Sequence, residues 1–80
     1  MSIENRVLEL VRSFQSDRSA AVGKLGREVE LYQGGLGWDS LDAAEFSARL
    51  EAAFGADPYS EGVFPNTVGD IVGFYESRGT

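Results

Sequence analysis

The chain has 80 residues, so it forms one domain, 1–80. Seven bases against thirteen acids give a formal net charge of −6, which nucleic acids and anionic membranes would repel. It contains no Cys and no His, which excludes disulfides, thiolate nucleophiles, Cys–His zinc sites and Ser-His-Asp triads. Hydrophobic residues make up 42% of the chain, enough for a core.

The charge is distributed unevenly along the chain. Residues 1–37 carry five acids and five bases, whereas residues 38–80 carry eight acids and only two bases, Arg49 and Arg78. Because Met1–Arg12 mixes apolar and charged residues, we expect no signal peptide, and no apolar run approaches the roughly 20 residues of a membrane span. We therefore expect a cytoplasmic monomer. A domain this small can hardly enclose an active site, so a surface function is favoured.

The first predicted element is an amphipathic helix over Ile3–Gln15. Ser2 is a suitable N-cap residue. Apolar residues then recur with helical spacing, at Ile3, Val7, Leu10, Val11 and Phe14. The following segment, Ser16–Glu30, is weakly periodic. It is compatible with a helical extension or a short turn around Ala20, Ala21, Val22 and Leu25.

A glycine-rich loop, Leu31–Gly37, leads into the second predicted helix, Ser40–Phe54. Asp39 is a good N-cap candidate for this helix, and Gly55 with Pro58 after it marks its end. Its expected core stripe consists of Ala43, Phe46, Leu50, Ala53 and Phe54.

The connector Asp57–Asn66 contains too many apolar residues for a free loop, and predicts a short helical turn packed on the core. Thr67 and Asp70 form a capping-box pattern for the last helix. Its apolar face comprises Val68, Ile71, Val72 and Tyr75. All five phenylalanines, Phe64 included, are expected in or beside the core. The predicted fold class is all-α: a small antiparallel four-helix bundle of three main helices and one short helix.

The segment Gly37–Asp42 places a serine, Ser40, in the first turn of a helix between two acids. From spacing alone, a capped helix start is the commonest interpretation. Ser40 has no nearby base to activate it, because the chain has no His and only one Lys. Its hydroxyl is nevertheless a possible substrate for another enzyme. A phosphoryl group there would meet free N–H groups and the positive end of the helix dipole. Since Asp39 and Asp42 oppose a buried phosphate, a solvent-facing phosphodiester fits better.

These residues carry a resemblance to a known family. Gly37-Trp38-Asp39-Ser40-Leu41 resembles the Gly-x-Asp-Ser-Leu signature of acyl carrier proteins. The segment Phe64–Ile71 is similar to the family's Thr-Val-x-Asp entry to its last helix, and Leu31–Gly37 is similar to the loop before the signature. The resemblance extends through the intervening helix and covers residues 31–75.

The resemblance implies that Ser40 carries a 4′-phosphopantetheine arm, within an attachment motif that includes Asp39 and Leu41. A separate phosphopantetheinyl transferase would attach the arm from coenzyme A with magnesium, and the arm's thiol would then hold acyl groups as thioesters. The chain itself would not be an enzyme. Its partners would be this transferase, acyl-loading or adenylating enzymes, and a ketosynthase or other acyl-processing enzymes. The start at Met1 favours a discrete carrier, and Trp38 with the glycine loop favours polyketide or other specialised biosynthesis over fatty acid synthesis.

The resemblance also makes the helix after Ser40 the main partner-recognition element. Its acidic residues outside the core stripe are Asp42, Glu45 and Glu51, and Arg49 is the only base on the same helix. This predicts an acidic face that is not balanced by local pairs and that steers basic partners. Two apolar residues beside Ser40 have two possible roles each. Leu41 is either an exposed contact or packed under the loop, and Trp38 either packs at the loop–helix junction or faces partners.

Three alternatives remain open at this point. The chain resembles peptidyl carriers of nonribosomal peptide pathways less closely, since those usually have Gly-Gly-His/Asp-Ser at the site. An acidic helical adaptor, with Ser40 only as a helix cap or a phosphoserine switch, belongs to another class. A small hydrolase with Ser40 as nucleophile is remote, because it lacks a base. A calcium site at Asp57 is not expected, since its loop lacks the ligand spacing of an EF-hand.

Overall fold

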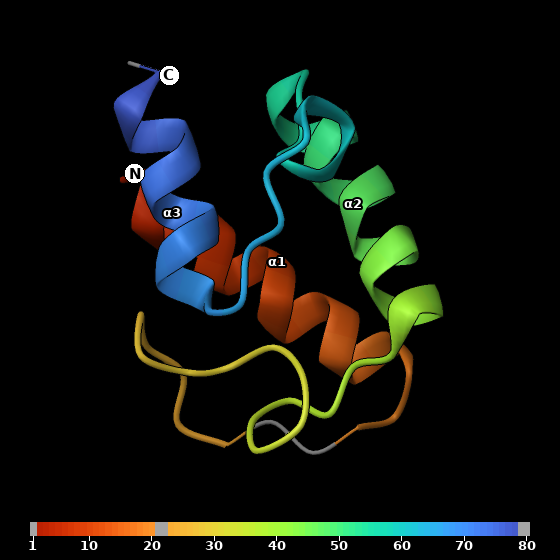
Figure 1. The fold of residues 1–80 in the computed structure, drawn as a ribbon. Coiled ribbons are helices and arrows are strands. Elements are labelled where there is room, and N and C mark those ends of the chain that lie inside the picture. Colours follow the sequence, from red (N-terminus) through yellow and green to blue (C-terminus); the bar gives the residue numbers. More distant parts are fainter. Residues whose placement is uncertain (1, 21–22, 79–80) are drawn as a thin grey trace.

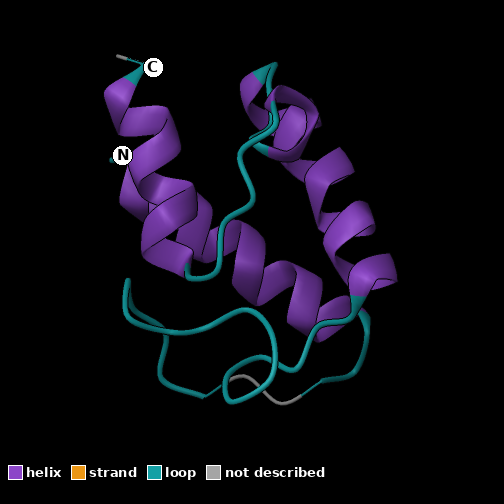
Figure 2. Cartoon of the chain, viewed as in Figure 1, coloured by secondary structure: helices purple, strands orange, loops and turns teal. Residues whose placement is uncertain are grey.

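Three α-helices and one 3-10 turn make up the regular structure of residues 2–20 and 23–78, which are the residues described by the computed structural model. The elements are α1 (Ile3–Asp17), α2 (Ser40–Phe54), η1 (Tyr59–Glu61) and α3 (Val68–Ser77). No strand occurs in these residues, as Figure 2 shows. The prediction of an all-helical chain is therefore confirmed. None of the helices described is both long and apolar enough to cross a bilayer.

Each α-helix begins at the cap residue that the sequence predicts. The Ser2 hydroxyl caps α1, and the carboxylate of Asp39 and the hydroxyl of Thr67 take part in capping boxes at the starts of α2 and α3. Gly55 ends α2 in the left-handed conformation, at φ 83°. Only α1 departs from its predicted bounds, continuing to Asp17 rather than stopping at Gln15.

The core lies where α1 crosses the other two helices. In Figure 1, α1 runs in the opposite sense to both α2 and α3, and it packs against each of them. The predicted apolar stripes supply most of the buried side chains. The core cluster comprises Val7, Val11, Phe14, Leu31, Trp38, Phe46, Leu50, Val68, Ile71, Val72 and Tyr75.

The long first connection is held against the start of α3 by backbone hydrogen bonds. The N–H of Leu31 donates to the carbonyl of Asn66, and the N–H of Val68 donates to the carbonyl of Val29, each at 2.9 Å. An isolated bridge between Glu30 and Thr67 belongs to the same contact. This pairing joins the connection to the helical layer (Figure 1) and so fixes the loop that delivers Ser40.

Of the helical extension or short turn that the sequence left open within Ser16–Glu30, the extension covers only Ser16 and Asp17, where α1 ends. A short turn follows directly, in which the Ser19 N–H donates to the carbonyl of Ser16 at 3.0 Å. Ala20 and Leu25 are not helical. Ala21 and Val22, the other two residues of that expectation, lie outside the described residues.

The prediction that the connector packs its apolar residues onto the core is wrong at its end. η1 forms as expected, but Phe64 is 72% exposed and Val63 is 43% exposed. The connector instead buries Pro58 and Pro65. The three residues between η1 and Pro65 all face solvent.

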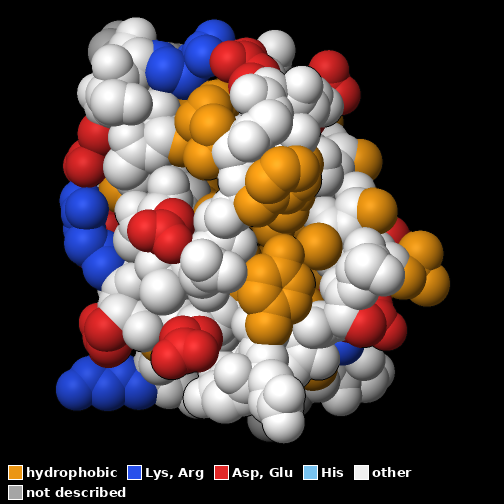
Figure 3. Space-filling view, in the orientation of Figure 1, with side chains coloured by type: hydrophobic (Ala, Val, Ile, Leu, Met, Phe, Trp, Pro, Cys, Tyr) orange, Lys and Arg blue, Asp and Glu red, His pale blue; other side chains and the backbone are white. Residues whose placement is uncertain are grey.

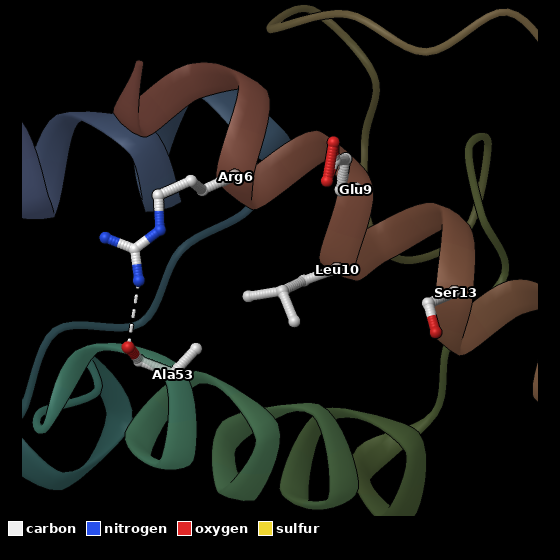
Figure 4. Close-up of a pocket in the computed structure, with 5 residues that line it drawn as sticks. All are labelled: Arg6, Glu9, Leu10, Ser13 and Ala53. Carbon is white, nitrogen blue, oxygen red and sulfur yellow. Dashed lines mark hydrogen bonds between the residues drawn. The ribbon is translucent and has the colours of Figure 1, made fainter. Parts of the chain in front are cut away.

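In a pocket of about 350 Å³ between α1 and α2, an arginine joins the two helices (Figure 4). A guanidinium nitrogen of Arg6 donates to the carbonyl of Ala53 at 3.0 Å, and the group lies 4.3 Å from the ring centre of Phe54. One of the unpaired carbonyls at the end of α2 is thereby satisfied. Arg6 therefore ties α1 to the far end of the helix that begins at Ser40.

Candidate functional site

Ser40 is the first residue of α2, and its side chain is exposed. Asp39, not Ser40, caps the helix. A carboxylate oxygen of Asp39 accepts from the N–H of Asp42 at 2.9 Å, and a carboxylate oxygen of Asp42 accepts from the N–H of Asp39 at 3.1 Å. The hydrogen bond from the Asp42 N–H lowers the pKa of Asp39. The Ser40 hydroxyl makes no hydrogen bond to any described residue, so it is open to chemistry from outside.

Trp38 is part of the core and not of the surface. It is 4% exposed, and its ring lies edge-on to Phe14 at 5.1 Å and tilted against Phe46 at 4.9 Å between ring centres. Its indole N–H donates to the side-chain oxygen of Gln15 at 2.7 Å. The packing role expected for Trp38 is confirmed, and its expected role in partner recognition is wrong, because a buried indole is not available to a partner.

Asp42 is not a free carboxylate. Arg18, at the end of α1, lies 2.9 Å from it, and the Asp42 side chain is only 15% exposed. The second guanidinium nitrogen of Arg18 donates to Gln15. The expectation of an unbalanced acidic face is therefore wrong at this residue, since a cation from another helix balances it. Asp42 joins α2 to α1 through this ion pair and also completes the capping box of α2.

The glycine loop before Ser40 has a fixed hydrogen-bonded path. The Trp38 N–H donates to the carbonyl of Leu31 at 2.9 Å, which closes the loop. A Cβ at Gly35 would lie 1.8 Å from the carbonyl oxygen of Glu30, so only glycine fits this close approach. Gly37 turns the chain at φ 75° immediately before Trp38. These residues position the start of α2 from outside the helix.

An open groove of about 450 Å³ begins at Ser40 and lies between α2 and the two loops facing it. Figure 3 shows apolar side chains gathered along the middle of this face, over α2 and the connector that leads to α3. The volume is within the range of small-ligand sites. The groove is lined by Tyr32, Ser40, Ala43, Ala44, Ser47, Tyr59 and Phe64.

Hydroxyl groups line part of this groove. The hydroxyls of Tyr32 and Tyr59 are 3.1 Å apart, and Ser47 donates to the buried carboxylate of Asp57 at 2.6 Å. Burial raises the pKa of Tyr59, so its hydroxyl stays protonated at neutral pH. Burial alone would raise the pKa of Asp57, but hydrogen bonds from Ser47 and Ser60 outweigh it and the pKa is lowered.

Sequence reasoning missed these groove residues. It gave the tyrosines no role and placed Phe64 in the core. A helical signal was available for Ser47, which follows Ser40 by two turns and therefore shares its face. No comparable local signal was available for Tyr32 or Tyr59, because their loops meet only in the folded chain.

The remaining predicted partner residues lie on the surface. Leu41 is 67% exposed, so it is not packed under the loop. Glu45 and Glu51 are also exposed, and neither forms an ion pair within residues 2–20 and 23–78. Arg49 does not oppose them, because it pairs with Asp17 of α1 at 2.7 Å.

The site contains a serine hydroxyl that can accept a group, but the described residues supply no catalytic partners for it. No described residue places a base within hydrogen-bond distance of the Ser40 hydroxyl. No group of three or more acidic side chains among the described residues is arranged to hold a metal ion. This arrangement can receive a group from another enzyme. Neither a known family model nor a solved structure matches the chain in the comparisons made.

Proposed function

We propose that this chain is an acyl carrier protein, with its helices arranged as the four-helix bundle of that family and with Ser40 as the attachment point of a 4′-phosphopantetheine arm. The observation that carries the proposal is the position of Ser40. Its exposed hydroxyl stands at the start of α2, takes no part in the cap, and begins an apolar groove. The signature-like segment Gly37–Leu41 surrounds it.

The residues around Ser40 fit a solvent-facing phosphodiester. The start of α2 supplies the positive end of a helix dipole. Asp42, one of the two neighbouring acids, is balanced by Arg18 at 2.9 Å. Asp39 remains negative and keeps the phosphate from being enclosed. When bound, the arm supplies a thiol that forms thioesters, which a chain without Cys cannot do by itself.

Ser40 acts as an acceptor in the transfer and does not catalyse it. Its oxygen forms a bond to the pantetheine-bearing phosphorus of coenzyme A while the pyrophosphate bond breaks. Adenosine bisphosphate leaves, and the hydroxyl proton goes to a base of the transferase, which also supplies the magnesium. This division of work agrees with the lack of a base at Ser40 within the described residues.

Partners in this proposal approach the start and outer face of α2. They comprise the transferase, acyl-loading or adenylating enzymes, and a ketosynthase or other acyl-processing enzymes, here in polyketide or other specialised biosynthesis. Leu41 offers an exposed apolar contact, and Glu45 and Glu51 offer unpaired negative charge. A basic partner surface with an apolar recess is complementary to these three residues.

The adaptor alternative loses its main argument. In one of its two forms Ser40 is the helix cap, but that position belongs to Asp39, whose carboxylate accepts the Asp42 N–H. The other form, a phosphoserine switch, is separated from the carrier by the mass of the group that Ser40 gains. An exposed serine that is not needed by the cap is better explained as a modification site.

The proposal is tested by incubating the purified chain with a broad-specificity phosphopantetheinyl transferase, coenzyme A and magnesium, and measuring the intact mass. We expect the wild type to gain one phosphopantetheine and Ser40→Ala to gain none. Ser47→Ala is the matched control, since it removes a hydroxyl from the same helix face and should still be modified. The proposal fails if the wild type gains no mass while a known carrier is fully modified in the same mixture.

A further inference from the structure

The groove beside Ser40 is apolar over most of its surface but contains three hydroxyl groups besides that of Ser40. They belong to Tyr32, Ser47 and Tyr59. Tyr32 lies in the connection before α2, and Tyr59 lies in η1, after α2. Their hydrogen bonding determines which kind of ligand the groove accepts.

The tyrosine pair leaves one donor open. Each phenol has a single hydrogen, so in the 3.1 Å contact between Tyr32 and Tyr59 one hydroxyl donates and the other accepts. Within the part of the chain that the structure describes, no group takes the hydrogen of the accepting hydroxyl. A ligand oxygen in the groove is therefore a suitable acceptor for it.

Ser47 leaves an acceptor open. Its only hydrogen is used at 2.6 Å by the carboxylate of Asp57, which is buried and also accepts from Ser60. The oxygen of Ser47 therefore keeps lone pairs toward the groove. Because the Asp57 carboxylate can only accept, Ser47 must be the donor in this hydrogen bond.

Two physical effects determine which group occupies the groove. Apolar surface drives an acyl chain out of water and into the groove, whereas the amides of the arm lose hydrogen bonds to water if they enter. A fully saturated chain, however, would cover the open tyrosine hydrogen and the Ser47 oxygen without bonding to either. Covering an unpaired polar group is unfavourable.

We propose that the groove beside Ser40 takes acyl chains bearing keto or hydroxy groups in preference to saturated chains of equal length. This inference rests on the proposed function, in which the chain is tethered to Ser40. A keto oxygen accepts from the tyrosine pair, and a hydroxyl group donates to the oxygen of Ser47.

The experiment compares four forms of the protein, each loaded at Ser40 by the transferase and verified by intact mass. One carries the arm alone, and the others carry octanoyl, 3-oxooctanoyl and 3-hydroxyoctanoyl chains. Backbone amide shifts in two-dimensional NMR report whether the chain occupies the groove, at residues 32, 44, 47, 59 and 64. We expect the ratio of docked to free chain to be about tenfold higher for the oxygenated chains, which is the ratio one hydrogen bond supports.

The variants separate the donor from the acceptor. Either single change, Tyr32→Phe or Tyr59→Phe, leaves one hydroxyl and should keep the preference for the keto chain. The double variant has no hydroxyl in the pair and should lose it. Ser47→Ala should weaken the preference for the hydroxy chain, whose oxygen can still accept from the tyrosine pair, and should leave the preference for the keto chain unchanged. Ser13→Ala, which removes a hydroxyl from the pocket between α1 and α2, is the control.

The outcomes distinguish this inference from the proposed function. Loading followed by equal docking of all three chains overturns the inference and leaves the carrier function standing. The inference is also overturned if the protein that carries the arm alone shows the same amide shifts as the acylated forms, since the arm would then occupy the groove. Failure to load overturns both. If the double tyrosine variant does not fold, Ser47→Ala with the hydroxy chain decides, and an unchanged preference refutes the inference.

Discussion

Replacement of Trp38 tests whether the loop–helix junction depends on a buried indole. The structure places Trp38 at 4% exposure between Phe14 and Phe46, with its N–H bonded to Gln15 at 2.7 Å. Truncating a buried aromatic residue of this kind to alanine costs about 3–5 kcal/mol. Domains of this class have a total stability of about 5–15 kcal/mol, so Trp38→Ala should remove a large share of it.

A more conservative substitution gives a smaller but still measurable loss of stability. Trp38→Phe keeps an aromatic ring but loses the hydrogen bond, about 0.5–1.5 kcal/mol, and some buried area. A total of about 2 kcal/mol corresponds to a fall in Tm of about 8–16 °C in a domain this size. Leu41→Ala is the matched control, because Leu41 is adjacent in the motif but 67% exposed. Its effect on stability should stay within about 0.5 kcal/mol.

Thermal and urea unfolding followed by far-UV circular dichroism measures both effects. Fluorescence is unsuitable, since the variants lack the chain's only tryptophan. The reasoning is refuted if Trp38→Ala and Leu41→Ala lower the Tm by similar small amounts. It is also refuted if Trp38→Phe impairs docking to a partner while leaving stability intact, because Trp38 would then be a surface contact.

Three further predictions concern caps and charges. Thr67→Ala should remove half of the capping box of α3 and cost about 1 kcal/mol, seen as a Tm lower by about 4–8 °C. The lowered pKa of Asp57 means that its contribution is present above about pH 4, the ordinary aspartate value, and is lost below it. Asp57→Asn should therefore flatten the acid limb of a stability–pH curve measured by urea unfolding. Asp42→Lys should destabilise the fold by about 1–3 kcal/mol, while Glu45→Lys should change stability by less than 0.5 kcal/mol and slow transferase docking at low salt in stopped-flow measurements.

The helices were predictable because their signals are local. Asp39 and Thr67 each lie three residues before an acid that completes a capping box, and Gly55 lies where a left-handed residue must end α2. Apolar spacing then identified the buried faces. These features depend on residues within one or two turns of each other, so the sequence contains them in readable form.

The groove was not predictable by the same means, since it depends on contacts between distant residues. Tyr32 and Tyr59 are 27 positions apart. Their hydroxyls meet only because the first connection is tied by backbone hydrogen bonds to Asn66 and Val68, and because η1 turns the second connection. Phe64 was placed in or beside the core because the spacing of the phenylalanines follows the helical faces. Its exposure follows from the burial of Pro58 and Pro65 on either side, which composition does not reveal.

Most of the acids that give residues 38–80 their excess negative charge make contacts within the fold. Of the eight acids after Gly37, six are used by the fold. Asp39 and Asp70 belong to capping boxes, Asp57 accepts from serines, and the other three face arginines: Asp42 with Arg18, Glu61 with Arg78, and Glu76 with Arg27. Of these eight acids, Glu45 and Glu51 have no such contact within the described residues, and neither have the exposed Glu9, Glu28 and Glu30 earlier in the chain. Glu45 and Glu51 both lie on α2, so the helix that begins at Ser40 carries exposed negative charge that no described cation pairs with.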